Sequence, residues 1–200
     1  MHKIIIIGAG FAGLSAAKRL SGFNSGLRIT LFDKKDSSDF LPLLPDAIGR
    51  RINPDFLAGK ISDLSGKKNL DFIKEEVIAV DFESRQVVTS NSSYTYDFLV
   101  IASGSQTNFF ANRDAQNHAY ALNSVDDAKR ILNALKEDKF ENFIICGGGY
   151  TGIEAASNLR LYCRKKGITA KIVIVERAPE ILGSLPGWMK SYVRANLESM

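Results

Sequence analysis

The chain has 200 residues, of which 45% are hydrophobic and 24% are charged, so a packed globular core is expected. The formal net charge is +4, but basic residues are interleaved with acidic ones, and we expect no nucleic-acid partner because that needs a clustered basic patch. No stretch approaches the roughly 20 apolar residues that span a bilayer, so we expect a cytoplasmic protein, at most peripheral on the cytoplasmic membrane face. Cys146, Cys163 and the two histidines match no metal-ligand spacing, and no metal site is expected.

The first 33 residues carry the pattern of strand, turn, helix and strand. Four isoleucines before Gly8 predict a buried strand over residues 3–7, and small residues predict a helix over 11–20. Gly22 and the turn-forming residues 24–26 are expected to end this helix before a second strand over 28–32. A unit of this kind predicts a parallel sheet with helices on its faces.

The next 80 residues change pattern twice. Residues 36–53 are expected to be irregular because of Pro42 and Pro45, and Asn53 is expected to cap a helix that begins at Pro54. Three short runs, 77–82, 86–89 and 94–96, alternate around turn residues and predict an antiparallel meander. Another buried strand is predicted over residues 98–102.

The strand–helix pattern restarts near residue 142. A capping box of Ser124 and Asp127 predicts a helix to about residue 138, followed by a strand over 142–146, a helix over 150–166 that Gly167 stops, and a strand over 171–175. A last helix is predicted to start at Pro186. Because this second unit has two strands where a doubly wound domain usually has four or more, we expect the chain to stop inside a domain. The predicted class is α/β: two Rossmann-like doubly wound parallel-sheet units with an antiparallel β-meander, the second unit truncated at its C-terminus.

Two glycine-rich turns stand between a strand and a helix. Gly8, Gly10 and Gly13 form G-x-G-x-x-G, a pattern that allows a tight turn, a close approach of the backbone to a pyrophosphate, and close packing of helix on strand. The N-terminus of the helix then offers N–H groups to phosphates. Asp33 follows Gly13 by 20 residues, where an acid can accept hydrogen bonds from a ribose.

The second turn, Gly147 to Gly152, repeats this pattern and has its acid at Glu176. A carboxylate there favours a free ribose 2′-hydroxyl, so we expect NADH over NADPH, although Arg177 could accommodate a 2′-phosphate. Two nucleotide sites on adjacent domains can place a hydride donor against an acceptor.

These motifs resemble the two-dinucleotide-binding flavoproteins, the pyridine nucleotide-disulfide oxidoreductase superfamily. Residues 96–105 are similar to the second FAD motif of that superfamily, with Ser103 in place of the usual Thr. The resemblance implies an FAD-binding domain over 1–112 and an incomplete NAD(H)-binding domain over 113–200. It implies FAD contacts from Gly8, Gly10, Phe11, Ala12, Gly13, Asp33, Lys34, Pro42, Val77, Ala102, Ser103 and Gly104. It implies NADH contacts from Gly147, Gly149, Tyr150, Thr151, Gly152, Glu176 and Arg177.

Residues 40–45, Phe-Leu-Pro-Leu-Leu-Pro, are similar to a stretch of type II NADH dehydrogenases, and no cysteine lies between Asp33 and Pro54. That resemblance implies hydride transfer from NADH to FAD and electron transfer to an acceptor, a quinone. Tyr150 stands where type II enzymes usually have Pro. Related reductases have Tyr there as a lid over the nicotinamide pocket, so Tyr150 is a candidate lid. Glu154 is a candidate residue at the flavin–nicotinamide contact.

Alternatives within the superfamily are a ferredoxin- or rubredoxin-type reductase and a sulfide:quinone reductase. A non-catalytic nucleotide-binding fragment is an alternative from another class. We expect the remainder of the protein, or a partner chain, to complete the sites, so that these 200 residues alone are inactive. Peripheral membrane contact through that remainder and a homodimer stay open.

Overall fold

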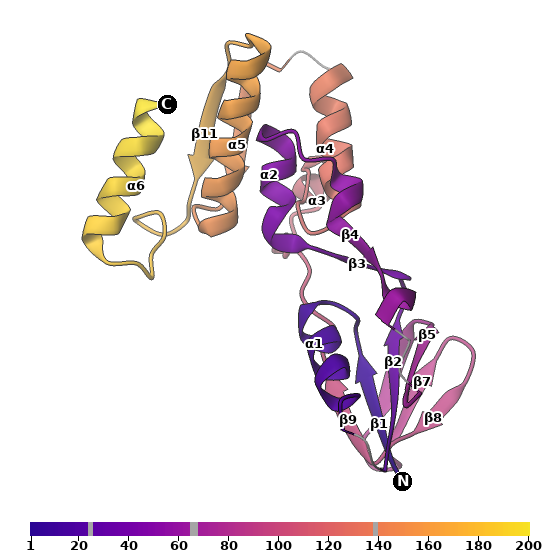
Figure 1. The fold of residues 1–200 in the computed structure, drawn as a ribbon. Coiled ribbons are helices and arrows are strands. Elements are labelled where there is room, and N and C mark those ends of the chain that lie inside the picture. The colour runs from indigo at the N-terminus through magenta and orange to yellow at the C-terminus, as the bar shows by residue number, and fades with distance from the viewer. Residues whose placement is uncertain (24–25, 65–67, 138–139) are drawn as a thin grey trace. The chain divides into compact units, whose positions relative to one another are not determined.

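The computed structural model describes residues 1–23, 26–64, 68–137 and 140–200 (Figure 1). The chain divides into two compact units: unit 1 comprises residues 1–39 and 58–107, and unit 2 comprises residues 40–57 and 108–200. The polypeptide therefore passes from one unit to the other three times. Residues 24 and 25 of the first predicted turn, and residue 138 at the predicted helix end, lie outside the described residues.

Unit 1 is built on a parallel sheet, as the sequence predicts, and the sheet includes one strand, over residues 70–74, that was not predicted. The strands are β1 (His2–Ile7), β2 (Leu27–Asp33), β5 (Leu70–Lys74) and β9 (Phe98–Ile101), in the order β5-β2-β1-β9. The helix α1 (Phe11–Leu20) packs against this sheet. Ile4 and Ile6 are buried with Ile29, Leu31 and Ala17 of α1, and Ile5 and Ile7 are buried in a second cluster with Phe32, so the four isoleucines before the first turn are core residues.

The meander is also confirmed, as a separate three-stranded antiparallel sheet. It consists of β6 (Val77–Asp81), β7 (Gln86–Thr89) and β8 (Ser93–Thr95). Strand β6 ends at Asp81, one residue before the predicted end, because the Asp81 carboxylate accepts hydrogen bonds from the N–H groups of Glu83 and Ser84 and folds the chain into a turn. Those bonds, led by the one from Ser84, hold the pKa of Asp81 below its usual value.

Two predictions for residues 36–57 are wrong. A region expected to be irregular contains β3 (Ser37–Asp39), the 3₁₀ turn η1 (Leu41–Leu43) and the helix α2 (Leu44–Gly49). Pro45 lies in the first turn of α2, where its missing N–H costs no hydrogen bond, so the proline helps to start the helix. The helix expected at Pro54 is only a 3₁₀ turn, η2 (Pro54–Leu57), although Asn53 caps it through a bond from the N–H of Asp55.

Strand β3 pairs antiparallel with β4 (Ala58–Lys60), and the 3₁₀ turn η3 (Ile61–Leu64) follows. The two strands flank residues 40–57 at both ends. Residues 40–57, which belong to unit 2, are thus joined at both ends to paired strands that belong to unit 1.

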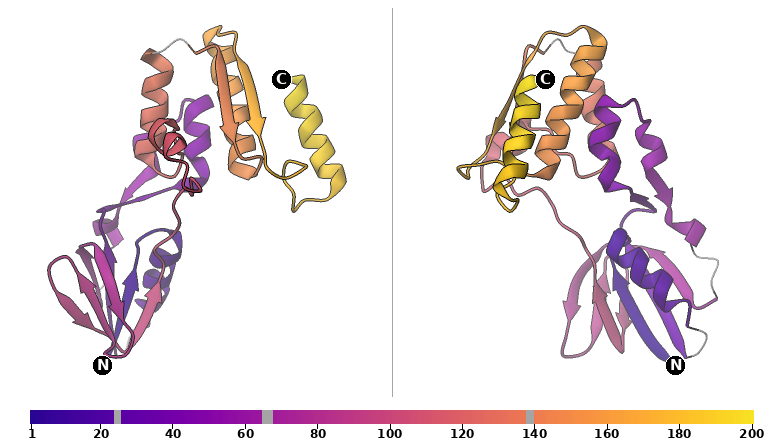
Figure 2. Two further views of the ribbon diagram at one scale, coloured as in Figure 1. Left: turned by 180° about the vertical axis from the view of Figure 1, so that it is seen from behind. Right: turned by 60° about the vertical axis from the view of Figure 1, so that its left-hand side comes forward.

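Unit 2 contains a short parallel strand pair, β10 (Asn142–Cys146) and β11 (Lys171–Val175). Helix α5 (Tyr150–Lys166) connects the strands and lies against one face of the pair (Figure 2). Gly167 ends α5 in the left-handed region at φ 68°, as expected of a glycine C-cap. The remaining helices are α3 (Arg113–His118), α4 (Val125–Glu137) and α6 (Gly187–Ser199).

The capping of α4 is close to the prediction. The N–H of Asp127 donates to Oγ of Ser124 over 3.1 Å, and the Asp127 carboxylate accepts from the N–H of Asn123 rather than Ser124.

Helix α2 packs beside α5 and α4, where Ile48 joins a buried apolar cluster with Leu135, Leu159 and Cys163. Among the described residues, no helix is both long enough and apolar enough to cross a membrane.

Candidate functional site

The two glycine-rich turns have the same backbone construction. In the first, the N–H of Gly8 donates to the carbonyl of Phe32 over 2.8 Å. In the second, the N–H of Gly147 donates to the carbonyl of Val175 over the same distance. Each turn therefore continues the pairing of its two parallel strands by one more bond before the chain enters the helix. Gly8 has φ 98° and Gly147 has φ 111°, a region that an L side chain rarely adopts, so glycine is required at both positions.

The third glycine of each turn is required by packing. A Cβ on Gly13 would collide with the carbonyl of Gly8, and a Cβ on Gly152 would collide with the carbonyl of Gly147. The helix thus lies too close to the strand for any side chain there, as the fingerprint predicts.

The second glycine of each turn has a different environment. A Cβ on Gly10 or Gly149 would meet no atom within 4 Å, and both residues are exposed. The fold itself therefore does not require glycine at these two positions. The open space beside them can receive a group that approaches the backbone more closely than a side chain would allow, which fits a pyrophosphate.

The two acids brace the turns that they follow. Oδ2 of Asp33 accepts from the N–H of Ala9 over 2.7 Å, and Oε2 of Glu176 accepts from the N–H of Gly148 over 2.7 Å. Oε1 of Glu176 also accepts from the N–H of Ala178 over 2.8 Å. The bonds from Ala178 and Gly148 hold the pKa of Glu176 below its usual value, so this carboxylate is negatively charged at neutral pH.

The sequence assigned these acids to ribose recognition alone, and their bracing role was missed. The only signal for it is the similar placement of the two acids, since Asp33 is the last residue of β2 and Glu176 directly follows β11. A carboxylate has about four acceptor sites, so the brace leaves lone pairs for sugar hydroxyls.

The helix N-termini that face the turns carry no side-chain cap. Gly10 and Gly149 are the N-cap residues of α1 and α5, and no acidic residue occupies the first turn of either helix. The first N–H groups of a helix have no partner within it, and they lie at the positive end of the helix dipole. Both helices therefore begin with the electrostatics that suits a phosphate.

Residues after β9 lie directly against the first turn. The N–H of Ala102 donates to the carbonyl of Ile7 over 2.8 Å, and a Cβ on Gly8 would collide with the carbonyl of Ala102. Ser103 and Gly104 follow as exposed residues, with Gly104 at φ 75°. The structure thus brings together two motifs that are about 90 residues apart in sequence.

Other predicted residues of the first site are more scattered. Lys34 follows Asp33 and forms an exposed ion pair with Glu76 over 3.7 Å. Val77 is half-buried at the start of β6. Pro42 is an exposed residue of unit 2, whereas the turn belongs to unit 1.

The predicted residues of the second site gather at the N-terminal end of α5 and the C-terminal end of β11. Tyr150 directly follows Gly149, and 60% of it is exposed. Thr151, Glu154 and Arg177 are exposed as well. These exposed side chains are accessible to a ligand.

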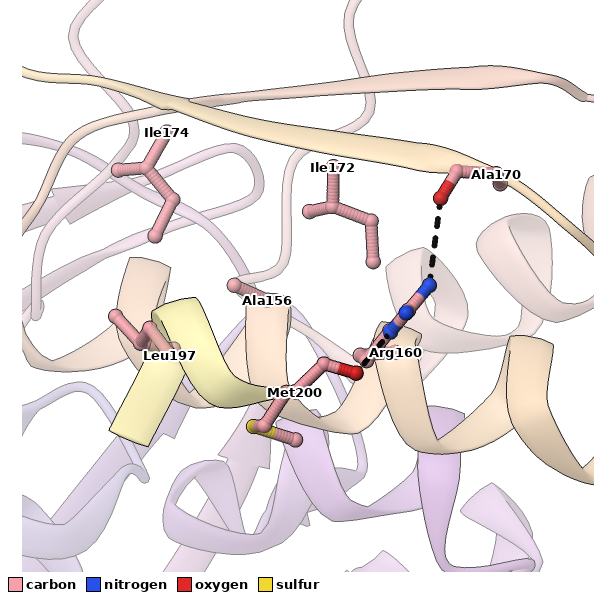
Figure 3. A pocket seen from close by; sticks show the side chains of 7 residues that line it. All are labelled: Ala156, Arg160, Ala170, Ile172, Ile174, Leu197 and Met200. Atoms are coloured by element: carbon pink, nitrogen blue, oxygen red, sulfur yellow. Dashed lines mark hydrogen bonds between the residues drawn. The ribbon is translucent and has the colours of Figure 1, made fainter. Parts of the chain in front are cut away.

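One cavity, of about 250 Å³, lies elsewhere in unit 2, between α5, β11 and the end of α6 (Figure 3). Arg160 crosses it and donates to the carbonyl of Met200 over 2.8 Å and to that of Ala170 over 3.4 Å. None of the predicted nucleotide contacts lines it, so it is separate from the second turn. Its lining residues are Ala156, Arg160, Ala170, Ile172, Ile174, Leu197 and Met200.

Neither cysteine lies within a glycine-rich turn. Cys163 is fully buried, and burial raises the pKa of its thiol. Cys146 is an exposed free thiol at the end of β10. Among the described residues, no three His, Cys, Asp or Glu side chains are grouped so as to hold a metal ion.

The sequence is similar to curated proteins that are named as reductases or oxidoreductases. The chain is 31% identical over 182 residues to terpredoxin reductase of a Pseudomonas species, covering 89% of this chain and 42% of that one. It is 28% identical over 202 residues to type II NADH:quinone oxidoreductase of Staphylococcus saprophyticus, covering 90% of this chain and 50% of that one. The chain therefore spans about half the length, or less, of these relatives.

Among solved structures, NDH2 from Plasmodium falciparum in complex with NADH superimposes with a TM-score of 0.86 at 22% identity, covering 99% of this chain and 46% of that one. At that identity the match shows a shared fold. The pyridine nucleotide-disulphide oxidoreductase family matches residues 2–200, nearly the whole sequence. With two braced glycine turns of the expected construction, this chain belongs to the pyridine nucleotide-disulphide oxidoreductase family.

Proposed function

We propose that the full-length protein is an FAD-dependent oxidoreductase that takes hydride from NADH and passes the electrons to a quinone. The observation that carries this proposal is the repeated turn. Two copies of one construction, each with an unhindered second glycine and an uncapped helix, offer two dinucleotide sites in one chain. A simple dehydrogenase of the Rossmann type needs only one.

The residues present fit both cofactors. At the first turn, Gly8 to Gly13 and the N-terminus of α1 would hold the FAD pyrophosphate, with Asp33 beside the ribose and residues 102–104 along the turn. At the second, Gly147 to Gly152 and α5 would hold NADH, with Glu176 beside its adenosine ribose. When bound, the flavin would supply the redox chemistry as hydride acceptor and electron donor. The domains expected from the sequence, 1–112 for FAD and 113–200 for NAD(H), stay a prediction, and residues 40–57 of the first range belong to unit 2.

The preference for NADH rests on charge. Glu176 is ionised and lies next to the turn, so it would repel a 2′-phosphate and accept hydrogen bonds from a 2′-hydroxyl. Arg177 is exposed and directly follows Glu176, but the Glu176 carboxylate is still present beside the turn.

Two side chains are assigned to the nicotinamide end. Tyr150, exposed at the start of α5, would act as a lid that moves when NADH enters. Glu154, exposed one turn later, would orient the nicotinamide amide. Tyr150→Ala should change the KM or kcat for NADH by a measurable factor, and unchanged values would contradict the lid role of Tyr150.

A second candidate acceptor is an iron–sulfur protein. Terpredoxin reductase, at 31% identity, supports a ferredoxin-type reductase as the alternative. A sulfide:quinone reductase is less well supported, because Cys163 is buried and Cys146 stands alone. A quinone reductase would work at a membrane surface, so we propose peripheral contact with the cytoplasmic membrane face through parts of the protein outside this chain.

The deciding experiment is steady-state NADH oxidation by the full-length protein. A soluble quinone, a [2Fe–2S] ferredoxin and sulfide with quinone are supplied in parallel to protein reconstituted with FAD. Turnover that requires the quinone supports the proposal, and turnover only with the ferredoxin supports the alternative. Absence of FAD binding, or of flavin bleaching by NADH, contradicts both and supports a non-catalytic nucleotide-binding protein.

A further inference from the structure

Residues 40–57, here called the docking segment, interrupt unit 1 in sequence but pack in unit 2. Its helix α2 lies beside α5, the helix that begins at the second turn (Figures 1 and 2). Leu44, Ala47 and Ile48 of α2 are buried. Buried apolar side chains therefore hold this segment in unit 2.

Apolar contacts alone are non-directional, but one polar contact adds direction. Asn158 of α5 is only 5% exposed, and its Nδ2 donates to Oδ1 of Asp46 over 3.1 Å and to the carbonyl of Glu154 over 3.1 Å. The same Oδ1 of Asp46 is 3.1 Å from Nε of Arg50, one turn later on α2. A buried amide that lost its acceptor would remain unsatisfied, so this bond selects one register of α2 on α5.

The two helices also cross very closely at the same place. A Cβ on Gly49 would collide with the backbone of Asn158. Nζ of Lys165, two turns further along α5, donates to the carbonyl of Gly49 over 2.9 Å. The close crossing and the two hydrogen bonds together fix both the distance and the sliding position of α2.

The docking segment is joined to unit 1 at both ends by the paired strands β3 and β4. If the proposed function holds, FAD is bound by unit 1 and NADH by unit 2, and hydride transfer needs a fixed geometry between them. We infer that Asp46 and Asn158 are a positioning pair, whose hydrogen bond anchors the docking segment on α5 and so couples the FAD-binding unit to the NADH-binding unit. Both residues lie outside the two glycine-rich turns, residues 8–13 and 147–152.

The pair makes a specific kinetic prediction, which rests on the proposed function. In full-length protein with FAD, Asp46→Ala and Asn158→Ala should each slow flavin bleaching by NADH by about tenfold, since a misplacement of about 1 Å can cost about a hundredfold. Affinity for ADP-ribose, which needs only the second turn and its acid, should stay within about twofold. The double variant should be slowed by less than the product of the two single effects, because both single changes remove the Asp46–Asn158 bond.

Asn196→Ala is the matched control. Asn196 lies on α6 in the same unit, and its Nδ2 donates to the carbonyl four residues earlier, Tyr192, over 2.8 Å, but its side chain is exposed. This variant should bleach at the unaltered rate. If the Asp46 and Asn158 variants also bleach at that rate, or lose ADP-ribose binding in proportion, the positioning role is wrong.

Hydrogen exchange separates this inference from the proposed function. In flavin-free full-length protein, peptides from residues 40–57 should exchange faster in Asn158→Ala than in Asn196→Ala. Unchanged exchange would overturn the anchor whatever the enzyme does. If the unaltered protein shows no response of the flavin to NADH, the proposed function fails, and the exchange result still decides whether the docking segment is anchored by this pair.

Discussion

Gly10 and Gly13 stand three residues apart in the first turn, but an added methyl group would have different effects. At Gly10 it would meet open space, and at Gly13 it would collide with the carbonyl of Gly8. Gly10→Ala should therefore change the free energy of unfolding by less than about 1 kcal/mol while lowering the FAD content of the purified full-length protein. Gly13→Ala should cost about 1–3 kcal/mol of stability as well.

Chemical denaturation and the flavin-to-protein ratio check this pair of variants. If Gly10→Ala retains full flavin occupancy, the open space beside it does not receive the pyrophosphate. Gly149→Ala and Gly152→Ala provide the same comparison at the second turn, with NADH affinity as the measurement.

The Glu176 carboxylate should decide which nicotinamide cofactor is used. Glu176→Gln removes the negative charge but keeps an oxygen that can accept from the N–H of Gly148. We expect the ratio of kcat/KM for NADH over NADPH to fall by about tenfold, equivalent to about 1.4 kcal/mol. Glu180→Gln is the control, because that acid is in the same unit but pairs with Lys190. An unchanged ratio in Glu176→Gln would show that the charge does not set the preference.

The brace by Glu176 should also depend on pH. Its pKa is lowered in the folded protein, first by the N–H of Ala178 and then by that of Gly148. Because the pKa is lowered, the ionised carboxylate stabilises the fold at pH values above 4.5, the ordinary pKa of Glu. This stabilisation is lost as the pH falls through the lower pKa of the folded protein. The difference in Tm between the unaltered protein and Glu176→Gln should thus be present at pH 7 and shrink below about pH 4. A difference that grows on acidification would contradict the brace.

At the scale of elements, hydrophobic periodicity predicted the long helices and strands correctly, whereas segments interrupted by proline were predicted wrongly. The strands β10 and β11 and the helix α5 have the residue bounds expected from their hydrophobic patterns. The helix α2 was missed because it has only six residues and begins with a proline, which can equally end a helix. Its partner α5 is more than 100 residues away in sequence, and no local pattern reports that contact.

The candidate site was predictable to the same extent. Turn glycines and acids follow from spacing, because a phosphate-binding turn imposes fixed steric demands on the backbone. The family resemblance implied only an FAD contact for Ala102, and its packing on the first turn was not predicted. Asp46 and Asn158 carry no motif at all, since their relation depends on how two helices cross.

The packing of α2 predicts the stability cost of a truncation there. Ile48 is 5% exposed among Leu135, Leu159 and Cys163, so Ile48→Ala should destabilise the protein by about 2–4 kcal/mol. Ile78→Ala, at a site where 64% of the residue is exposed, should cost less than about 0.5 kcal/mol. Urea denaturation gives both values, and similar costs for the two variants would mean that α2 does not pack as described.

At the scale of the whole molecule, unit 2 presents apolar surface that its own described elements do not cover. Helix α5 lies on one face of the β10–β11 pair, while alternate residues on the other face, Ile144, Cys146, Val173 and Val175, are exposed. The relatives are about twice as long as this chain or longer. In a doubly wound domain both sheet faces are covered by helices, so we predict that helices of the full-length protein cover this face.

Residues 1–200 expressed alone should therefore bind FAD poorly and oxidise NADH slowly, if at all. The exposed face should also bind a hydrophobic dye more strongly than the full-length protein does, since large apolar patches are rare on folded monomers. Flavin stoichiometry after reconstitution, NADH-driven bleaching and dye fluorescence, measured side by side on both proteins, test this. Near-stoichiometric flavin with rapid bleaching in residues 1–200 would mean that the two turns suffice for both cofactors, and the requirement for the rest of the protein would be withdrawn.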